Sequence, residues 1–157
     1  MKRMMTLLLA GMLLLPAAAC GGSGGGVPNA DLAGFYSELQ QEFGWESLVP
    51  TEDDLLDAYY PGLDEVDTEQ LIAVAPMMSA VVNEMVFLEA DSEQDAIAAE
   101  AILQKRLDDQ IAGGAWYPES IAAWEKGEVI REGKFVALIA SNDRQEEVAE
   151  RFRALFR

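Results

Sequence analysis

The sequence predicts an α+β domain, in which two N-terminal helices precede a strand–strand–helix unit that occurs twice. Three observations favour this fold class. Apolar residues recur at helical spacing in three long segments, and two further segments are rich in Val, Ile, Met and Phe. A Pro or Gly interrupts each of these two segments, which is typical of β-hairpins. Two hairpins can combine into a four-stranded antiparallel sheet, so we expect that sheet with the helices packed on one face.

Two helices are expected before the first strand. The first occupies residues 29–44, where Asn29 can cap the first turn and Gly44 can end the last one. The second is a short helix in which Thr51 begins a capping-box pattern and which Pro61 ends. Both helices have an apolar face, so we expect both to pack against the sheet.

Two hairpins are expected to form the sheet. The first lies within residues 70–90, where Pro76 and the pair Ser79–Ala80 separate two strands. The second lies within residues 128–141 and turns next to Gly133. Because proline cannot donate a hydrogen bond to a strand ladder, Pro76 indicates a sheet edge or a bulge.

Helices are also expected after each hairpin. A long helix over residues 92–112 has a buried stripe made of Ala96, Ala99, Leu103, Leu107 and Ile111. A short helix follows Pro118, and a terminal helix follows Ser141. We expect one core to contain apolar residues of the terminal helix and of the last strand, namely Phe152, Leu155, Phe135 and Leu138.

Residues 1–19 have the three parts of a secretory signal. Lys2 and Arg3 form the positive region, a mostly apolar run extends over residues 4–15, and three alanines precede Cys20. A transmembrane helix needs about 20 apolar residues, so this run is too short to span a bilayer. The segment is therefore interpreted as a targeting signal.

Cys20 stands between small residues and the stretch GGSGGG. This arrangement resembles a bacterial lipoprotein signal, in which Cys20 receives a diacylglyceryl group and becomes the mature N-terminus. Residues 20–28 then form a lipidated, glycine-rich tether and residues 29–157 a single domain. Ala17 stands where leucine is usual, and ordinary secretion with a free thiol at Cys20 is the alternative. The expected location is the extracytoplasmic face of the cell membrane.

Charge divides the chain into two unequal halves. The chain has 28 acidic and 11 basic residues, and its formal charge is −17. Residues 20–104 contain 18 acidic residues and no lysine or arginine. An excess of negative charge this large repels phosphate backbones, so no nucleic-acid partner is expected. The acidic half favours either a solvated surface or a binder of divalent cations or cationic peptides.

Catalysis is not expected, and no cofactor is implied. The chain has no histidine and a single cysteine, which excludes Ser–His–Asp, Cys–His and histidine–zinc sites. Only pairs of carboxylates, such as Glu84 with Glu89, keep open the alternative of a small glycoside hydrolase. The acidic cluster at Asp64, Glu65 and Asp67 could bind calcium, but an EF-hand loop is absent and we assign no metal ligands.

Aromatic and methionine side chains are the remaining candidates for a binding surface. The aromatic residues that could stack on a carbohydrate are Trp45, Trp116, Tyr117 and Trp124. Met77 and Met78 could form a soft groove for a peptide. In both cases a structural role in closing the core is the alternative.

Several stretches together resemble the domain-of-unknown-function 4358 family of bacterial lipoproteins. They include VAPMMS with Met77 and Met78, NEMVFLEA with Glu84, WYPESIAAW with Tyr117, and EGKFVALIASND. The resemblance extends over almost the whole chain after the signal and implies the α+β architecture and lipidation at Cys20. The family has no assigned activity, so the resemblance implies no catalytic residues. We therefore expect a non-catalytic binding or assembly module for a protein or cell-envelope partner, with Met77, Met78, Glu84 and Tyr117 as candidate binding residues.

Overall fold

The computed structural model describes residues 29–45, 47–78 and 80–157, and the predicted signal 1–19 and tether 20–28 with Cys20 lie outside the described residues. Within the described residues, the α+β class is confirmed: helices combine with one antiparallel sheet of five strands. The strands are β1 (Leu48–Pro50), β2 (Thr68–Pro76), β3 (Asn83–Ala90), β4 (Glu128–Glu132) and β5 (Phe135–Ser141).

The described helices lie close to the predicted positions. They are α1 (Leu32–Phe43), α2 (Asp53–Tyr59), α3 (Glu93–Asp109), α4 (Pro118–Lys126) and α5 (Gln145–Ala154). A short 3₁₀-helix, η1 (Leu63–Glu65), follows α2, and a π-helical turn, η2 (Gln110–Gly114), ends α3. Because α4 separates α3 from the second hairpin, the order is not a plain repeat of strand–strand–helix units.

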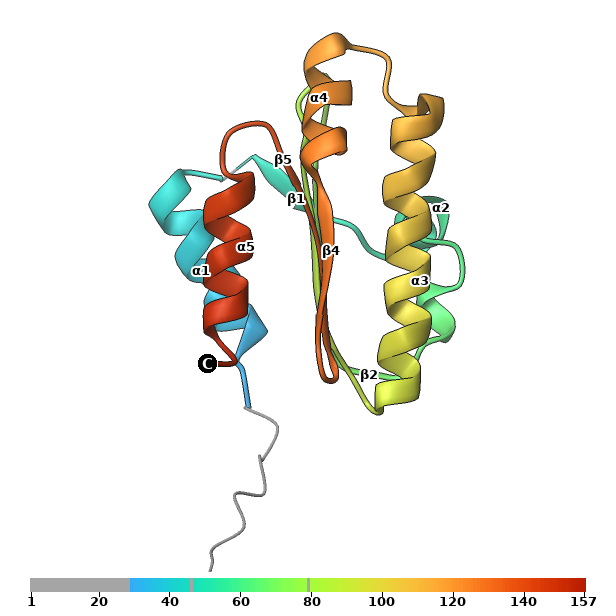
Figure 1. The fold of residues 1–157 in the computed structure, drawn as a ribbon, viewed down its shortest axis with the longest axis vertical. Helices are drawn as coiled ribbons and strands as arrows, with labels where there is room; N and C mark the ends of the chain where they lie inside the picture. The colour runs from blue at the N-terminus through green and yellow to red at the C-terminus, as the bar shows by residue number, and fades with distance from the viewer. Residues whose placement is uncertain (1–28, 46, 79) are drawn as a thin grey trace, which may run out of the picture.

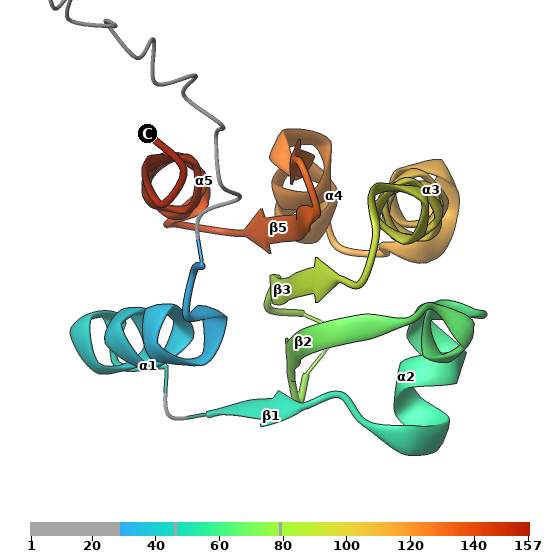
Figure 2. The same cartoon turned by 90° about the horizontal axis from the view of Figure 1, so that it is seen from below.

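Helices cover both faces of the sheet, so the prediction that they cover one face was wrong. The strand order is β1-β2-β3-β5-β4. One core lies between the sheet and helices α1 and α5, and a second lies between the sheet and helices α2, α3 and α4 (Figures 1 and 2). Every residue of β3 and β5 is buried. A strand that is buried on both faces must be covered by other elements on both sides of the sheet. The nearly unbroken apolar runs of these two strands are the sequence pattern that indicates such burial.

The fifth strand, β1, was not predicted. It has three residues and pairs antiparallel with the end of β2, with Leu48 opposite Pro76 and Pro50 opposite Val74. A segment this short has no measurable hydrophobic period, and proline lowers its strand propensity. Pairing with β2, rather than local sequence preference, therefore explains this strand.

For α1 and α2, the predicted helix ends are confirmed, but the two predicted N-terminal caps are wrong. Gly44 ends α1 with a positive φ of 67°, as expected. The first turn is capped by Asp31 instead of Asn29, because the Asp31 carboxylate accepts a hydrogen bond of 2.9 Å from the Gly34 N–H. Thr51 does not cap α2: its hydroxyl is buried and has no hydrogen-bond partner among the described residues.

The terminal helix packs as predicted, with one exception in the strand below it. Phe135 and Phe152 are fully buried in the α1/α5 core, and Leu155 is half-buried against it. The Phe152 ring stacks on Phe87 with centroids 5.8 Å apart. Leu138 lies in the opposite core, because residues three apart on a strand point to opposite faces.

The stripe of α3 is also confirmed except at its end. Ala96, Ala99, Leu103 and Leu107 are buried. Ile111 falls in the π-helical turn and is 41% exposed, since the wider turn rotates it out of the helix face. The stripe therefore ends one turn earlier than the sequence predicted.

Truncation of Phe152 to alanine should destabilise the domain strongly. The side chain is fully buried among aromatic rings, so its removal leaves a cavity, and we expect a loss of about 3–5 kcal/mol in the free energy of unfolding. Urea unfolding measures it. Ile97→Ala, at a position 46% exposed, should change stability far less. Equal losses for the two variants would contradict the packing described for α5.

Candidate functional site

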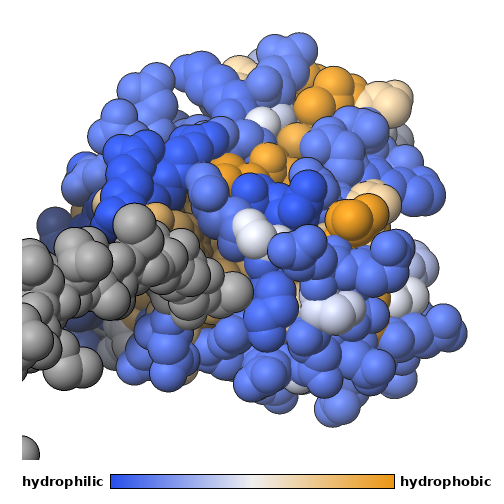
Figure 3. Space-filling model, turned by 60° about the horizontal axis from the view of Figure 1, so that its bottom comes forward, coloured by the Kyte–Doolittle hydropathy of each residue, from blue (hydrophilic) through white to orange (hydrophobic). Residues whose placement is uncertain are grey.

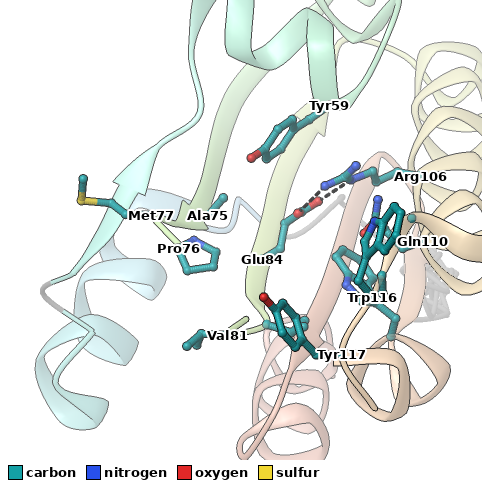
Figure 4. Close-up of a pocket in the computed structure, with 14 residues that line it drawn as sticks. Tyr59, Ala75, Pro76, Met77, Val81, Glu84, Arg106, Gln110, Trp116 and Tyr117 are labelled. Atoms are coloured by element: carbon teal, nitrogen blue, oxygen red, sulfur yellow. Dashed lines mark hydrogen bonds and ion pairs between the residues drawn. The ribbon is translucent and has the colours of Figure 1, made fainter. Parts of the chain in front are cut away.

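A cavity of about 650 Å³ opens where the β2–β3 turn approaches the connection between α3 and α4. Aromatic and apolar side chains form its walls, and a charged pair lies at its base (Figure 4). We call it the aromatic pocket. Its principal lining residues are Tyr59, Pro76, Met77, Val81, Glu84, Arg106, Gln110, Trp116, Tyr117 and Trp124.

Exposed apolar side chains gather around this pocket. In the described part of the chain, large hydrophobic side chains that are exposed lie mostly here: Met77, Met78, Val81, Trp116 and Tyr117. Trp116 is 86% exposed and Met77 81%. By contrast, the end of the molecule that comes forward in Figure 3 presents mainly hydrophilic residues. Clustered apolar exposure of this kind is typical of an interaction surface.

A bidentate ion pair forms the base of the pocket. Arg106 Nε donates to Glu84 Oε1 at 2.9 Å, and Arg106 Nη2 donates to Oε2 at 2.8 Å. The Tyr60 hydroxyl donates to the same Oε1 at 2.8 Å. Burial, together with the Glu84 carboxylate, raises the pKa of Tyr60 well above its usual value, so the phenol remains a protonated donor.

The ion pair follows from the place of Glu84 in the sheet. Glu84 lies on the central strand β3, and its side chain is only 5% exposed. A buried carboxylate requires a partner, and α3 supplies it because Arg106 lies one turn beyond Leu103 at the border of the buried stripe. Burial opposes the charge of Arg106, but its hydrogen bonds and attraction to Glu84 outweigh this effect and raise its pKa.

Aromatic rings hold the guanidinium in place. Its carbon lies 4.4 Å from the centroid of the Tyr59 ring and 5.5 Å from the Trp124 ring. Cation–π contacts of this length fix the plane of the guanidinium. The third nitrogen of Arg106, Nη1, has no acceptor among the described residues. Nη1 is therefore a donor that Arg106 retains for a ligand.

Hydrogen bonds tie down the β2–β3 turn that carries Met77 and Met78. The Val82 N–H donates to Asn142 Oδ1 at 2.6 Å, and the Asn142 N–H donates to the Val82 carbonyl at 2.9 Å. The Ser120 hydroxyl donates to the Ala80 carbonyl at 3.3 Å. These bonds join the turn to the β5–α5 connection and to α4. Two other parts of the fold thus hold the methionine side of the pocket in place.

The other side of the pocket depends on a glycine. Gly113 has a φ of 138°, which residues with a Cβ rarely adopt, and it lies inside the π-helical turn after α3. The chain then turns so that Trp116 and Tyr117 precede α4, which starts with Pro118 in its first turn. This geometry places two exposed aromatic side chains opposite the β2–β3 turn (Figure 4).

Three of the four predicted binding residues line the aromatic pocket. They are Met77, Glu84 and Tyr117, whereas Met78 is 66% exposed next to Met77. Sequence reasoning missed Arg106, although it is the first arginine after the signal and borders the buried stripe of α3. Its position at the end of an acidic stretch was the sequence feature that could have identified Arg106 as a site residue.

The predicted aromatic residues divide into two groups. Trp116 and Tyr117 are exposed at the pocket, and Trp124 is buried beneath Arg106 with one edge on the cavity. Trp45 is buried far from the pocket in the other core, where it packs on Phe43. Trp45 is therefore a core residue, in agreement with the alternative that these aromatic side chains close the core.

The suggested carboxylate pair Glu84 and Glu89 is not formed. The two residues are five positions apart on β3, so they point to opposite faces of the sheet. Glu89 accepts a hydrogen bond of 2.7 Å from Gln70 on the α1 side, whereas Glu84 binds Arg106 on the α3 side. The pair therefore cannot flank one substrate.

The described residues contain neither a metal-binding cluster nor a membrane-spanning helix. In residues 29–45, 47–78 and 80–157, no three His, Cys, Asp or Glu side chains gather in a way that could hold a metal ion. Over the same residues, no helix combines the length and the apolar character that crossing a bilayer requires.

Removal of the Arg106 guanidinium should cost more than removal of an exposed one. Arg106→Met leaves Glu84 buried without its cation, and we expect a loss of about 3–5 kcal/mol in the free energy of unfolding. Arg131→Met breaks the more exposed pair with Glu100 and should cost under about 1 kcal/mol. The double variant Glu84→Gln/Arg106→Met should recover part of the loss. Chemical unfolding compares them, and equal losses for both single variants would contradict this account.

Comparison with known proteins assigns more than half of the chain to one family. No curated protein and no solved structure matches the chain. A family model described as a domain of unknown function (DUF4358) matches residues 44–141, a narrower range than the predicted resemblance. This range extends from the end of α1 to the end of β5 and contains all five described strands and the whole lining of the aromatic pocket. The chain therefore belongs to the DUF4358 family.

Proposed function

We propose that the protein is a non-catalytic binding module, held at the extracytoplasmic face of the cell membrane by a lipid on Cys20, which binds a partner protein through the aromatic pocket. The observation that carries the proposal is the gathering of exposed apolar side chains around one cavity, with Trp116 and Met77 on opposite sides of it. Apolar and aromatic anchors in a pocket supply most of the free energy in protein–protein binding.

The chemistry of the pocket favours an apolar side chain of the partner, flanked by a carbonyl or carboxylate oxygen. The walls include aromatic rings and the apolar residues Pro76 and Val81, which suit an apolar anchor. At the base, Arg106 Nη1 is available as a donor to an oxygen. Hydrogen bonds already hold the β2–β3 turn and ring contacts hold Arg106, so binding would require little ordering of these groups.

The ion pair at the base supports a non-catalytic role. Both oxygens of Glu84 accept hydrogen bonds from Arg106, and one also accepts from Tyr60. A carboxylate engaged in this way is a poor general base or nucleophile, because attack or proton transfer would break the interactions that offset the cost of its burial.

The place of the pocket in the fold is compatible with an N-terminal anchor. The described chain begins near the start of α1, at the lower end of the domain in Figure 1, whereas α4 and the α3–α4 connection lie at the upper end. An anchor that precedes residue 29 would therefore leave the aromatic pocket on the side away from the membrane. A partner could reach the pocket there.

Photo-crosslinking in living cells tests the pocket. With benzoylphenylalanine in place of Met78, we expect a discrete adduct with a partner protein, because this side chain is exposed beside the pocket. The same replacement at Ile97, on an exposed face of α3, is the matched control and should give none. Trp116→Ser in the Met78-labelled chain should abolish the adduct. An adduct of equal yield at Ile97, or one that survives Trp116→Ser, would count against the pocket as the binding site. An adduct with a glycan would contradict the proposal that the partner is a protein.

Metabolic labelling tests the anchor. If Cys20 is acylated, a fatty-acid analogue should label the protein, and the protein should partition into the detergent phase. Cys20→Ser should abolish both properties without loss of folding, since the tether is rich in glycine and separates Cys20 from the domain. Mass spectrometry of the N-terminal peptide is the decisive measurement: an unmodified peptide that begins at Cys20 would establish ordinary secretion instead.

A further inference from the structure

A second recess lies at the edge of the sheet, apart from the aromatic pocket. β1 ends at Pro50 and the chain turns into α2, so β1 pairs only with the last residues of β2. The earlier part of β2, residues 68–72, pairs with β3 on one side and with no described strand on the other. A cavity of about 340 Å³ lies along this edge. We call it the edge slot.

The edge slot wraps around the strand edge instead of lying on one face. Tyr36 of α1 lines it on one side of the sheet and Leu56 of α2 on the other, with Leu71 and Ile72 of β2 between them. Ile72 belongs to the α1 face, and Leu71 to the α2 face. Figure 2 shows β1 at the outer edge of the sheet with α1 and α2 on its two sides. The slot continues the line of β1 and has the geometry of a missing strand position.

Backbone groups of β2 point into this position. The Ala73 carbonyl accepts a hydrogen bond of 2.8 Å from the Thr51 N–H, so the polar groups of Ala73 face the outer edge. Because polar groups alternate between the two sides of a strand, the N–H and C=O of Leu71 face the same edge, where no described backbone group pairs with them. The other sheet edge, β4, is protected by the charged residues Arg131 and Glu132.

Two hydroxyl groups in the slot walls also have no partner. Tyr36 Oη and Thr51 Oγ1 are both buried, and neither forms a hydrogen bond with any described residue. Buried polar groups are nearly always paired in folded proteins. Burial raises the pKa of Tyr36, so its phenol is a protonated donor at neutral pH. Both hydroxyls could donate to carbonyl oxygens of an added strand.

Charge around the slot indicates a cationic occupant. Glu52 and Asp53 line it, and residues 29–104 contain no lysine or arginine. A second copy of the chain would bring the same acidic edge against this one, and like charges would oppose that pairing. A basic segment would be attracted to it instead.

We propose that the edge slot binds an extended basic segment of a partner protein as an added strand, which pairs with β2 in line with β1. Main-chain hydrogen bonds to Leu71 would provide the pairing, Leu71 and Ile72 would contact alternate side chains, and the acidic rim would select lysine or arginine. This site is separate from the aromatic pocket and does not depend on the function proposed for that pocket.

Peptide binding to the full-length chain tests the proposal. The probe is a capped seven-residue peptide of alternating lysine and valine, and binding is measured by calorimetry at physiological salt. Methylation of alternate backbone nitrogens keeps the charge but removes the donors, so it should weaken binding about tenfold or more. A counterpart with glutamate in place of lysine should not bind. Equal affinity of the methylated peptide would overturn strand addition.

Variants of the slot separate binding from folding. Tyr36→Phe and Thr51→Val remove hydroxyls that have no partner in the described structure, so neither should lower the melting temperature, but each should weaken peptide binding about threefold to tenfold. Trp116→Ser, in the aromatic pocket, should leave peptide binding unchanged. Loss of peptide binding in Trp116→Ser would place the peptide in the aromatic pocket and overturn the proposal. Sedimentation that shows a dimer dissociated by the peptide would assign the edge to a second copy instead.

Discussion

The burial of β3 and β5 on both faces is the constraint on which the rest of the fold depends. Two adjacent central strands without an exposed residue can exist only between two layers of helices. Helices α1 and α5 supply one layer, and α2, α3 and α4 supply the other. β3 carries a glutamate to each face, so both carboxylates must find partners inside the protein.

Each of these two partnerships organises a different part of the molecule. On one face, Glu84 recruits Arg106 of α3 and Tyr60, and the pair becomes the base of the aromatic pocket. On the other face, Glu89 binds Gln70, whose side chain also donates to the Ala30 carbonyl and accepts from the Leu32 N–H. The satisfaction of buried charge therefore positions α3 on one side of the sheet and the start of α1 on the other.

Local sequence determined how much could be predicted. The long helices and both hairpins follow from hydrophobic period, and Gly44 ended α1 as expected. β1 and the second helical layer could not be predicted in the same way, because pairing with β2 and two-sided burial are tertiary effects. At the pocket, the sequence singled out Met77, Glu84 and Tyr117. Only the fold shows that Arg106, 22 positions after Glu84, binds its carboxylate.

Helix α2 connects the two candidate sites. Leu56 faces the edge slot, and Tyr59, one turn later, stacks on Arg106 in the aromatic pocket. A helix of seven residues gains little stability from its own hydrogen bonds, so its position depends on tertiary contacts such as those of Leu56 and Tyr59. A strand in the slot would add contacts to Leu56, and a ligand in the pocket would add contacts to Tyr59. Because either ligand would hold the same helix, binding at one site should favour the helix position that the other site requires.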